Sequence, residues 1–176
     1  MKKSVIVAPG SGAVRHDMSL TVVDRVKSAT RQFSKSIQTM SVSEQLQREL
    51  LDKAIEVAKN AYAPYSKYPV GACLQCADGT RFTGCNVENA SYGLTNCAER
   101  TAMFKAVSEG HRDHAMIAIV TLDGGLPCAA CRQVMREFNK DMIVICGYTD
   151  GRVNRVFTLE ELLPHSFGPE NLEALQ

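Results

Sequence analysis

The sequence has no apolar run long enough to cross a bilayer and no excess of charge of one sign. A spanning helix needs about 20 consecutive apolar residues, and no stretch of the 176-residue chain approaches that length. Lys and Arg number 20 against 19 Asp and Glu, so the net charge of +1 creates no field that would attract a polynucleotide or an anionic membrane surface. We therefore expect no membrane partner and no polynucleotide partner.

The chain also lacks a convincing secretory signal and cannot pair all of its cysteines. Its first residues, MKKSVIVAPGSG, are basic but contain too short an apolar stretch for such a signal, so we expect a soluble, cytoplasmic protein. Cysteines number seven, which is odd. In an intracellular chain this favours metal ligation or catalysis over a disulfide framework.

Composition divides the chain into an extension and one domain. Residues 1–40 carry Gly, Ser and seven Lys or Arg against two Asp, without sustained periodicity, which predicts a flexible N-terminal extension. A loose fit to an organellar presequence is the weaker alternative. Residues 41–176 contain no repeats and have the length and apolar content of a single domain.

Hydrophobic periodicity predicts a helix and then a hairpin at the start of this domain. Ser41 and Glu44 have the spacing of a capping box, and apolar positions from Leu46 to Ala61 share one helical face. The next segment, VGACLQCADGTRFTGCNV, indicates two strands joined at Asp78-Gly79, a dipeptide in which both residues tolerate positive φ.

The rest of the domain alternates helices with strands. A second helix is expected from Asn96 to Glu109 and a third from Pro127 through CAACRQVMREF. The apolar runs MIAIVTL and MIVICG predict buried strands, NRVFTL an edge strand and LEELLP a short helix. This order predicts an α/β fold in which a mixed five-stranded sheet lies between helices, a three-layer α/β/α domain.

Three cysteines are candidate ligands of one zinc ion. Cys128 and Cys131 are three residues apart at the start of the third helix, so both sulfurs lie on one face of it. Cys97 has a similar position at the start of the second helix, and helix N-termini stabilise thiolates. Three thiolates leave one tetrahedral position open, as in catalytic zinc sites.

Glu99 and Arg100 follow Cys97 and suit a catalytic role beside the zinc ion. Zinc lowers the pKa of bound water toward about 7, and Glu99 is placed to pass that proton to a substrate nitrogen. The negative charge of three thiolates opposes this lowering of the water pKa. Arg100 is a candidate to spread that charge by donating hydrogen bonds to sulfur. An ordinary surface arginine is an equal interpretation.

A closed Cys₄ site is the rival metal hypothesis and would make the protein a binding module. Cys73 and Cys76 have C-x₂-C spacing and would join Cys128 and Cys131. Residues three apart on a regular strand point to opposite faces, however, so this pair cannot share an ion unless the strand breaks into a turn. Cys73, Cys76 and the two further cysteines, Cys85 and Cys146, are interpreted as small buried apolar residues.

The motifs resemble those of the small, homotetrameric, zinc-dependent cytidine deaminases that act on free nucleosides. CAE followed by PCAAC matches the zinc motif of that superfamily. The segments YPVGACL, GCNVENASYG, PCAACRQVMREF and ELLPHSFGPENL extend the resemblance over residues 46 to 172.

The resemblance implies an enzyme that hydrolyses cytidine and 2′-deoxycytidine to uridine and 2′-deoxyuridine in pyrimidine salvage. By matching position, Cys97, Cys128 and Cys131 would hold one Zn²⁺ per chain. Zinc-bound hydroxide would attack C4 of the base, with Glu99 as the proton shuttle and ammonia as the leaving product.

The same resemblance assigns the substrate-binding residues. Asn86 and Glu88 match residues that hold the ribose 3′-hydroxyl, and Ala98 also lies at the substrate. Tyr68 stands where the family usually has a phenylalanine that packs on the base, so its hydroxyl needs a partner. Phe167 matches an aromatic residue that reaches into a neighbouring subunit's site, which implies a homotetramer with shared active sites.

Two other functions share part of this pattern. A deaminase of a different aminated heterocycle would keep the zinc motif but change the sugar-side loop, whereas NVENA is intact here. An inactive zinc-binding relative would be expected to lose the acid, whereas Glu99 is present.

Overall fold

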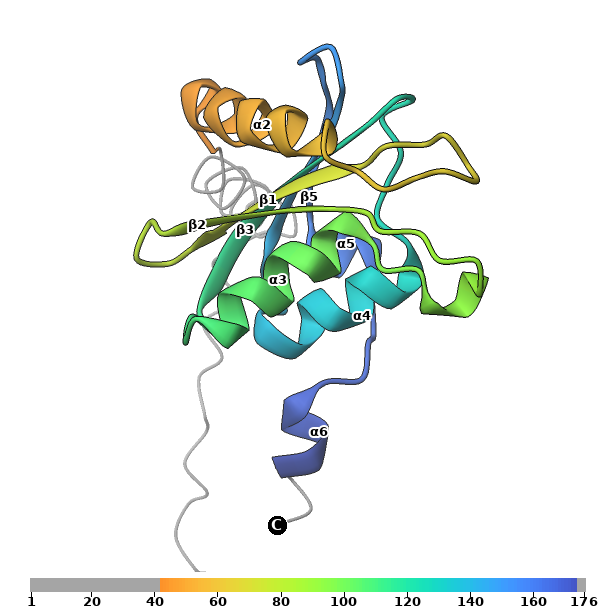
Figure 1. Ribbon diagram of the computed structural model, residues 1–176. Coiled ribbons are helices and arrows are strands. Elements are labelled where there is room, and N and C mark those ends of the chain that lie inside the picture. The colour runs from red at the N-terminus through yellow and green to blue at the C-terminus, as the bar shows by residue number, and fades with distance from the viewer. Residues whose placement is uncertain (1–41, 174–176) are drawn as a thin grey trace, which may run out of the picture. The chain divides into compact units, whose positions relative to one another are not determined.

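Five strands form a single mixed sheet in the computed structural model, which describes residues 42–173 (Figure 1). The strand order is β2-β1-β3-β4-β5, in which β3 and β4 are parallel and the other neighbours are antiparallel. The mixed five-stranded sheet is therefore confirmed, with β5 at an edge. The strands are β1 Gly71–Cys76, β2 Arg81–Cys85, β3 His114–Thr121, β4 Ile143–Tyr148 and β5 Val153–Thr158.

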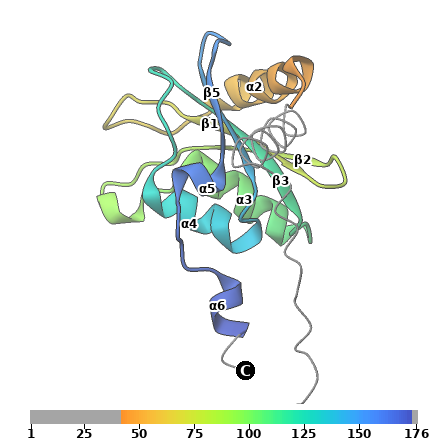
Figure 2. The ribbon, with the colours of Figure 1, turned by 180° about the vertical axis from the view of Figure 1, so that it is seen from behind.

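Helices cover both faces of the sheet and complete the expected three layers. Figure 1 shows α2 on one face and α3, α4 and α5 on the other, and Figure 2 shows the same arrangement from behind. A short 3₁₀ helix, η1, and a C-terminal helix, α6, were not predicted. The helices are α2 Glu44–Ala58, η1 Tyr92–Leu94, α3 Ala98–Ser108, α4 Ala129–Phe138, α5 Leu159–Leu162 and α6 Pro169–Glu173. The flexible extension predicted for residues 1–40 lies outside the described residues.

The sheet separates two apolar cores, and β3 contributes to both. Ile117 and Ile119 pack in the core beneath α3 and α4, whereas Ala118 and Val120 pack in the core beneath α2. Successive strand residues point to opposite faces, so an apolar run such as this one needs cover on both sides. The structure provides that cover.

The first helix differs from its prediction at both ends. Its N-cap is Ser43, whose Oγ accepts a hydrogen bond from the Leu46 amide at 3.2 Å. The capping role predicted for Ser41 is therefore wrong, and Ser41 itself lies outside the described residues. The helix ends at Ala58 and does not reach Ala61, because Tyr62 instead pairs with the strand-like segment at Val87. Long-range pairing thus overrides the helical pattern.

The hairpin between β1 and β2 also turns differently. Gly79 has φ of 87°, but the non-glycine residues with positive φ in the described part are Lys67 and His165, so Asp78 does not use that region. The Gly79 amide donates to the Cys76 carbonyl at 3.0 Å, and the Cys76 amide donates to the Thr80 carbonyl at 2.8 Å. These bonds make a three-residue loop that ends in a left-handed glycine.

None of the helices within residues 42–173 combines the length and hydropathy that are needed to cross a bilayer.

Gly84 is expected to be essential for packing β2 against α3. A Cβ at this position would lie 2.4 Å from the Ala102 amide nitrogen and 2.6 Å from the Ala98 carbonyl oxygen. Gly84→Ala should therefore lower the free energy of unfolding by about 1–3 kcal/mol, as overpacked cores do, measured by urea denaturation. Gly93→Ala is the control, because a Cβ there meets nothing within 4 Å. Equal midpoints for the two variants would contradict this packing argument.

Candidate functional site

The three candidate zinc ligands lie at the N-termini of α3 and α4. These helices begin at Ala98 and Ala129, slightly later than predicted, so that Cys97 and Cys128 are the N-caps. Cys131 lies in the first turn of α4 and is fully buried. The first amide groups of a helix have no partner within it, so both sulfur-bearing ends favour negative charge.

The spacing of the three sulfur atoms fits a single zinc ion. Sγ of Cys97 lies 4.0 Å from Sγ of Cys128, and all three sulfur atoms lie within 4.8 Å of one another. Two sulfur atoms bound to one tetrahedral zinc at 2.3 Å would be about 3.8 Å apart. A donor set of three soft thiolates also suits zinc.

The thiols differ strongly in acidity before any metal is considered. A hydrogen bond from Cys131 and the neighbouring Arg100 guanidinium lower the pKa of Cys97 to about 5. The hydrogen bond from the Cys131 thiol to Cys97, together with burial, raises the pKa of Cys131. Nη2 of Arg100 donates to Sγ of Cys97 at 3.4 Å and to the Thr95 carbonyl at 3.2 Å. The first of these bonds is the contact with sulfur that the sequence suggested for this arginine.

Glu99 is a buried carboxyl group beside the sulfur cluster. It is only 4% exposed, on the first turn of α3. Burial raises the pKa of its carboxyl, and the negative charge of Cys97 acts in the same direction. A carboxyl group with a raised pKa is suited to exchange protons near neutral pH.

Glu99 and two of the three sulfur-bearing residues, Cys97 and Cys128, line a pocket of about 340 Å³, a size common for small-molecule sites. The pocket includes seven of the residues expected at the site: Tyr68, Asn86, Glu88, Cys97, Ala98, Glu99 and Cys128. Its other lining residues are Ser66, Val70, Thr95, Ile119, Thr121, Gly125 and Leu126. The structure thus gathers residues from four separate parts of the sequence.

Asn86 and Glu88 are held in place by the backbone of the loop before β1. The Asn86 amide donates to the Tyr68 carbonyl at 2.9 Å and accepts from the Val70 amide at 2.8 Å. Oε2 of Glu88 accepts from the amides of Tyr65 and Ser66 at 2.8 and 3.2 Å. Both side chains therefore order this loop, and each keeps further hydrogen-bonding capacity toward the pocket.

The hydroxyl of Tyr68 has a partner that the sequence did not reveal. It donates a hydrogen bond to Oδ1 of Asp123, in the loop between β3 and α4. The same oxygen accepts from the Thr121 hydroxyl at 3.0 Å and from the Gly125 amide at 3.1 Å. In the sequence, Asp123 precedes two glycines directly after a buried strand. This pattern indicates a turn and does not identify a partner for Tyr68.

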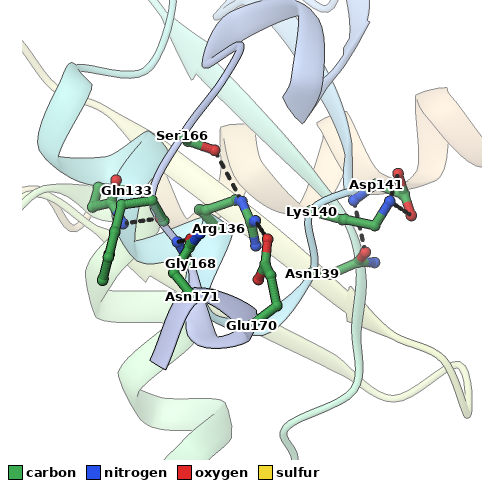
Figure 3. Close-up of polar contacts among 10 residues, drawn as sticks. Gln133, Arg136, Asn139, Lys140, Asp141, Ser166, Gly168, Glu170 and Asn171 are labelled. Carbon is green, nitrogen blue, oxygen red and sulfur yellow. Dashed lines mark hydrogen bonds and ion pairs between the residues drawn. The ribbon is translucent and has the colours of Figure 1, made fainter. Parts of the chain in front are cut away.

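Phe167 does not reach the pocket of its own chain. Its side chain is 60% exposed, on the segment that precedes α6. Figure 3 shows how α4 holds this segment: Arg136 Nε donates to Ser166 Oγ at 2.9 Å, and Gln133 Nε2 donates to the Phe167 carbonyl at 3.0 Å. The almost buried guanidinium of Arg136 also pairs with Glu170. These bonds leave the Phe167 ring facing outward.

The remaining cysteines do not form a second zinc-binding group with PCAAC. Cys73 packs in the core under α2 and Cys76 in the core under α3, so the pair lies on opposite faces of the sheet, as predicted. Cys73, Cys76 and Cys146 are buried, but Cys85 is only half-buried, and its thiol lies 3.5 Å from the Asn60 carbonyl. The burial expected for Cys85 is therefore wrong, because β2 is an edge strand.

Comparison with known proteins agrees with this chemistry. The family model described as "Cytidine and deoxycytidylate deaminase zinc-binding region" matches residues 44–147. This range contains the three sulfur atoms and Glu99, so the expected zinc cofactor is confirmed, with Cys97, Cys128 and Cys131 as its candidate ligands.

The similar curated proteins and solved structures include further cytidine deaminases. A cytidine deaminase of Halalkalibacterium halodurans is 50% identical over 126 residues, which are 70% of this chain and 95% of the relative. A probable cytidine deaminase of Dictyostelium discoideum is 44% identical over 136 residues, 73% of this chain and 91% of the relative. The crystal structure of a cytidine deaminase from Burkholderia pseudomallei shares 46% identity at a TM-score of 0.65, covering 72% of this chain and 100% of that one.

Replacing a candidate ligand should remove the metal. Cys128→Ala leaves two thiolates, so we expect its zinc content after dialysis to fall well below one ion per chain, measured by elemental analysis. Cys85→Ala, which removes a sulfur atom outside the cluster, should retain zinc. Full zinc content in Cys128→Ala would mean that this ligand set is wrong.

Proposed function

Because the chain belongs to the cytidine and deoxycytidylate deaminase family, we propose that it hydrolyses cytidine and 2′-deoxycytidine to uridine and 2′-deoxyuridine, releasing ammonia, in pyrimidine salvage. One observation carries this proposal: the buried carboxyl of Glu99 lines one pocket of suitable size together with Cys97 and Cys128 of the three-sulfur cluster. The curated relatives that are named cytidine deaminase support the choice of substrate.

Glu99 is the proton carrier of the proposed reaction. Its carboxylate accepts one proton from the attacking water and delivers it to N3 of the base, then accepts the second proton from the hydroxyl now on C4 and delivers it to the departing amino group. Burial raises the pKa of this carboxyl, which brings it closer to neutral pH and makes both directions of transfer accessible. The net change consumes one water and releases one ammonia.

The sulfur cluster supplies the other half of the chemistry. When bound there, zinc acts as a Lewis acid that makes a water molecule nucleophilic near neutral pH. Arg100 contacts Sγ of Cys97 at 3.4 Å and partly offsets the negative charge of the thiolates. We propose that this contact preserves the acidity of the metal, since excess negative charge around an ion weakens it.

Asn86 and Glu88 are proposed to bind the ribose. Both line the pocket, and their backbone hydrogen bonds hold them in fixed orientations. Hydrogen bonds from Ser66 and Tyr65 keep the pKa of Glu88 below its usual range, so it is ionised at neutral pH. An anionic carboxylate at the sugar disfavours a nearby phosphate, which supports a free nucleoside over a nucleotide or polynucleotide.

We also propose a homotetramer in which subunits share active sites. The outward-facing Phe167 and its anchoring to α4 support this arrangement, because an exposed aromatic ring gains free energy when another subunit covers it. The cytoplasmic location stays a prediction from the sequence.

Glu99→Gln should separate catalysis from folding. We expect it to retain zinc and the wild-type melting temperature but to lose about 10²–10⁴-fold in kcat, the usual contribution of a general acid-base group. Glu109→Gln, an equal change of charge at the exposed far end of α3, is the control and should keep wild-type turnover. Turnover by Glu99→Gln within a few fold of wild type would refute the mechanism.

The choice of substrate is tested with the zinc-loaded wild-type protein. Cytidine, deoxycytidine and their 5′-monophosphates are supplied separately, and uracil products are followed by chromatography. Conversion of the nucleosides alone is expected. Conversion of no substrate would instead favour a different aminated heterocycle or a zinc-binding protein without activity.

A further inference from the structure

Two loops that are distant in the sequence are joined directly at the wall of the pocket. Tyr68 lies in the loop before β1, and Asp123 lies in the loop that connects β3 to α4. The Tyr68 hydroxyl donates to Oδ1 of Asp123, and this oxygen also accepts from Thr121 and Gly125. One carboxylate oxygen thus accepts three hydrogen bonds, from both loops and from the end of β3.

The partners of Asp123 line the pocket, whereas Asp123 itself does not. Tyr68, Thr121 and Gly125 are all lining residues. The Gly125 amide is held twice, by Asp123 at 3.1 Å and by the Thr121 hydroxyl at 2.6 Å. Asp123 therefore influences the pocket only through the lining residues that it binds.

Tyr68 is fixed at both its backbone and its hydroxyl. Asn86 holds the Tyr68 carbonyl at 2.9 Å and the Val70 amide at 2.8 Å, while Asp123 holds the end of the ring. Because its hydroxyl is bound to Asp123, Tyr68 offers the pocket its aromatic ring and not a hydroxyl donor. A ring fixed in this way loses little conformational freedom when a flat ligand stacks on it.

We propose that Asp123 is a positioning residue that sets the orientation of the Tyr68 ring and the position of Gly125, and thereby the affinity of the pocket for the planar base. This inference rests on the proposed function. Neither Asp123 nor the Tyr68 hydroxyl belongs to the sulfur cluster or contacts Glu99 in the described residues. The link should therefore affect substrate binding and leave the chemical step unchanged.

A double-mutant cycle tests the link by steady-state kinetics. Tyr68→Phe keeps the ring and removes the hydroxyl, and Asp123→Ala removes its acceptor. Each is expected to raise KM for cytidine by about 3–10-fold, the range for losing one partly exposed hydrogen bond to a charged group. We expect kcat to stay within about twofold of the wild-type value, because the link between Tyr68 and Asp123 does not contact the groups that carry out the chemical step.

The cycle must also show coupling between the two residues. In the Asp123→Ala background, Tyr68→Phe should cause no further rise in KM, because its partner has already gone. Tyr62→Phe and Asp52→Ala make the same chemical changes at exposed positions outside the pocket and should leave KM unaltered. Independent, multiplying effects of Tyr68→Phe and Asp123→Ala would overturn the proposal, as would an unchanged KM in either.

A second measurement does not depend on turnover. Hydrogen exchange of a peptide covering residues 121–126 should be faster in Tyr68→Phe and Asp123→Ala than in wild type, and unchanged in Tyr62→Phe. If the wild-type protein converts no pyrimidine nucleoside, the proposed function fails, and hydrogen exchange still decides whether the link orders this loop. A wild-type rate of hydrogen exchange for this peptide in both Tyr68→Phe and Asp123→Ala would overturn the proposal.

Discussion

Three sulfur atoms can share one cation only if the N-termini of α3 and α4 lie side by side, and the sheet satisfies this requirement. The two helices pack on the same face, where they and the strands form one apolar core. Gly84 lets β2 approach the first turn of α3 closely enough for this arrangement. A shift of either helix by one turn, about 5.4 Å, would separate the sulfur atoms beyond the reach of one ion.

The electrostatics of the site follow from this same arrangement. Negative charge gathers at two helix N-termini, where unpaired amides and Arg100 offset it, while Glu99 is buried within the same few residues. Burial opposes ionisation of Glu99, and the charge of Cys97 opposes it further. The folded domain therefore keeps a strongly acidic thiol and a weakly acidic carboxyl two residues apart in the sequence.

The pocket wall depends on polar side chains that bind backbone groups. Asn86 and Glu88 were expected at the ribose, yet in the structure they first order the loop that carries Tyr68. Structural and ligand-binding roles are compatible here, because an amide and a carboxylate each have more hydrogen-bonding capacity than these contacts use. Asp123 extends the same principle to the opposite loop.

Local patterns in the sequence determined most of the fold and the chemical character of the site. Periodicity predicted the order of helices and strands, and the spacing of Cys128 and Cys131 placed both sulfurs on one helix, because each pattern depends on near neighbours. Tertiary structure decided where the first helix ends, how the hairpin turns at Gly79, that Cys85 is half-buried, and that Asp123 is the partner of Tyr68. The end of the first helix and the partner of Tyr68 depend on contacts between segments that are distant along the chain, and the half-burial of Cys85 depends on its position at a sheet edge. The loop at Gly79 is likewise tied to a distant segment, because the Ala77 amide donates to the Asp113 carbonyl at 2.8 Å. A single sequence carries no local signal for such contacts.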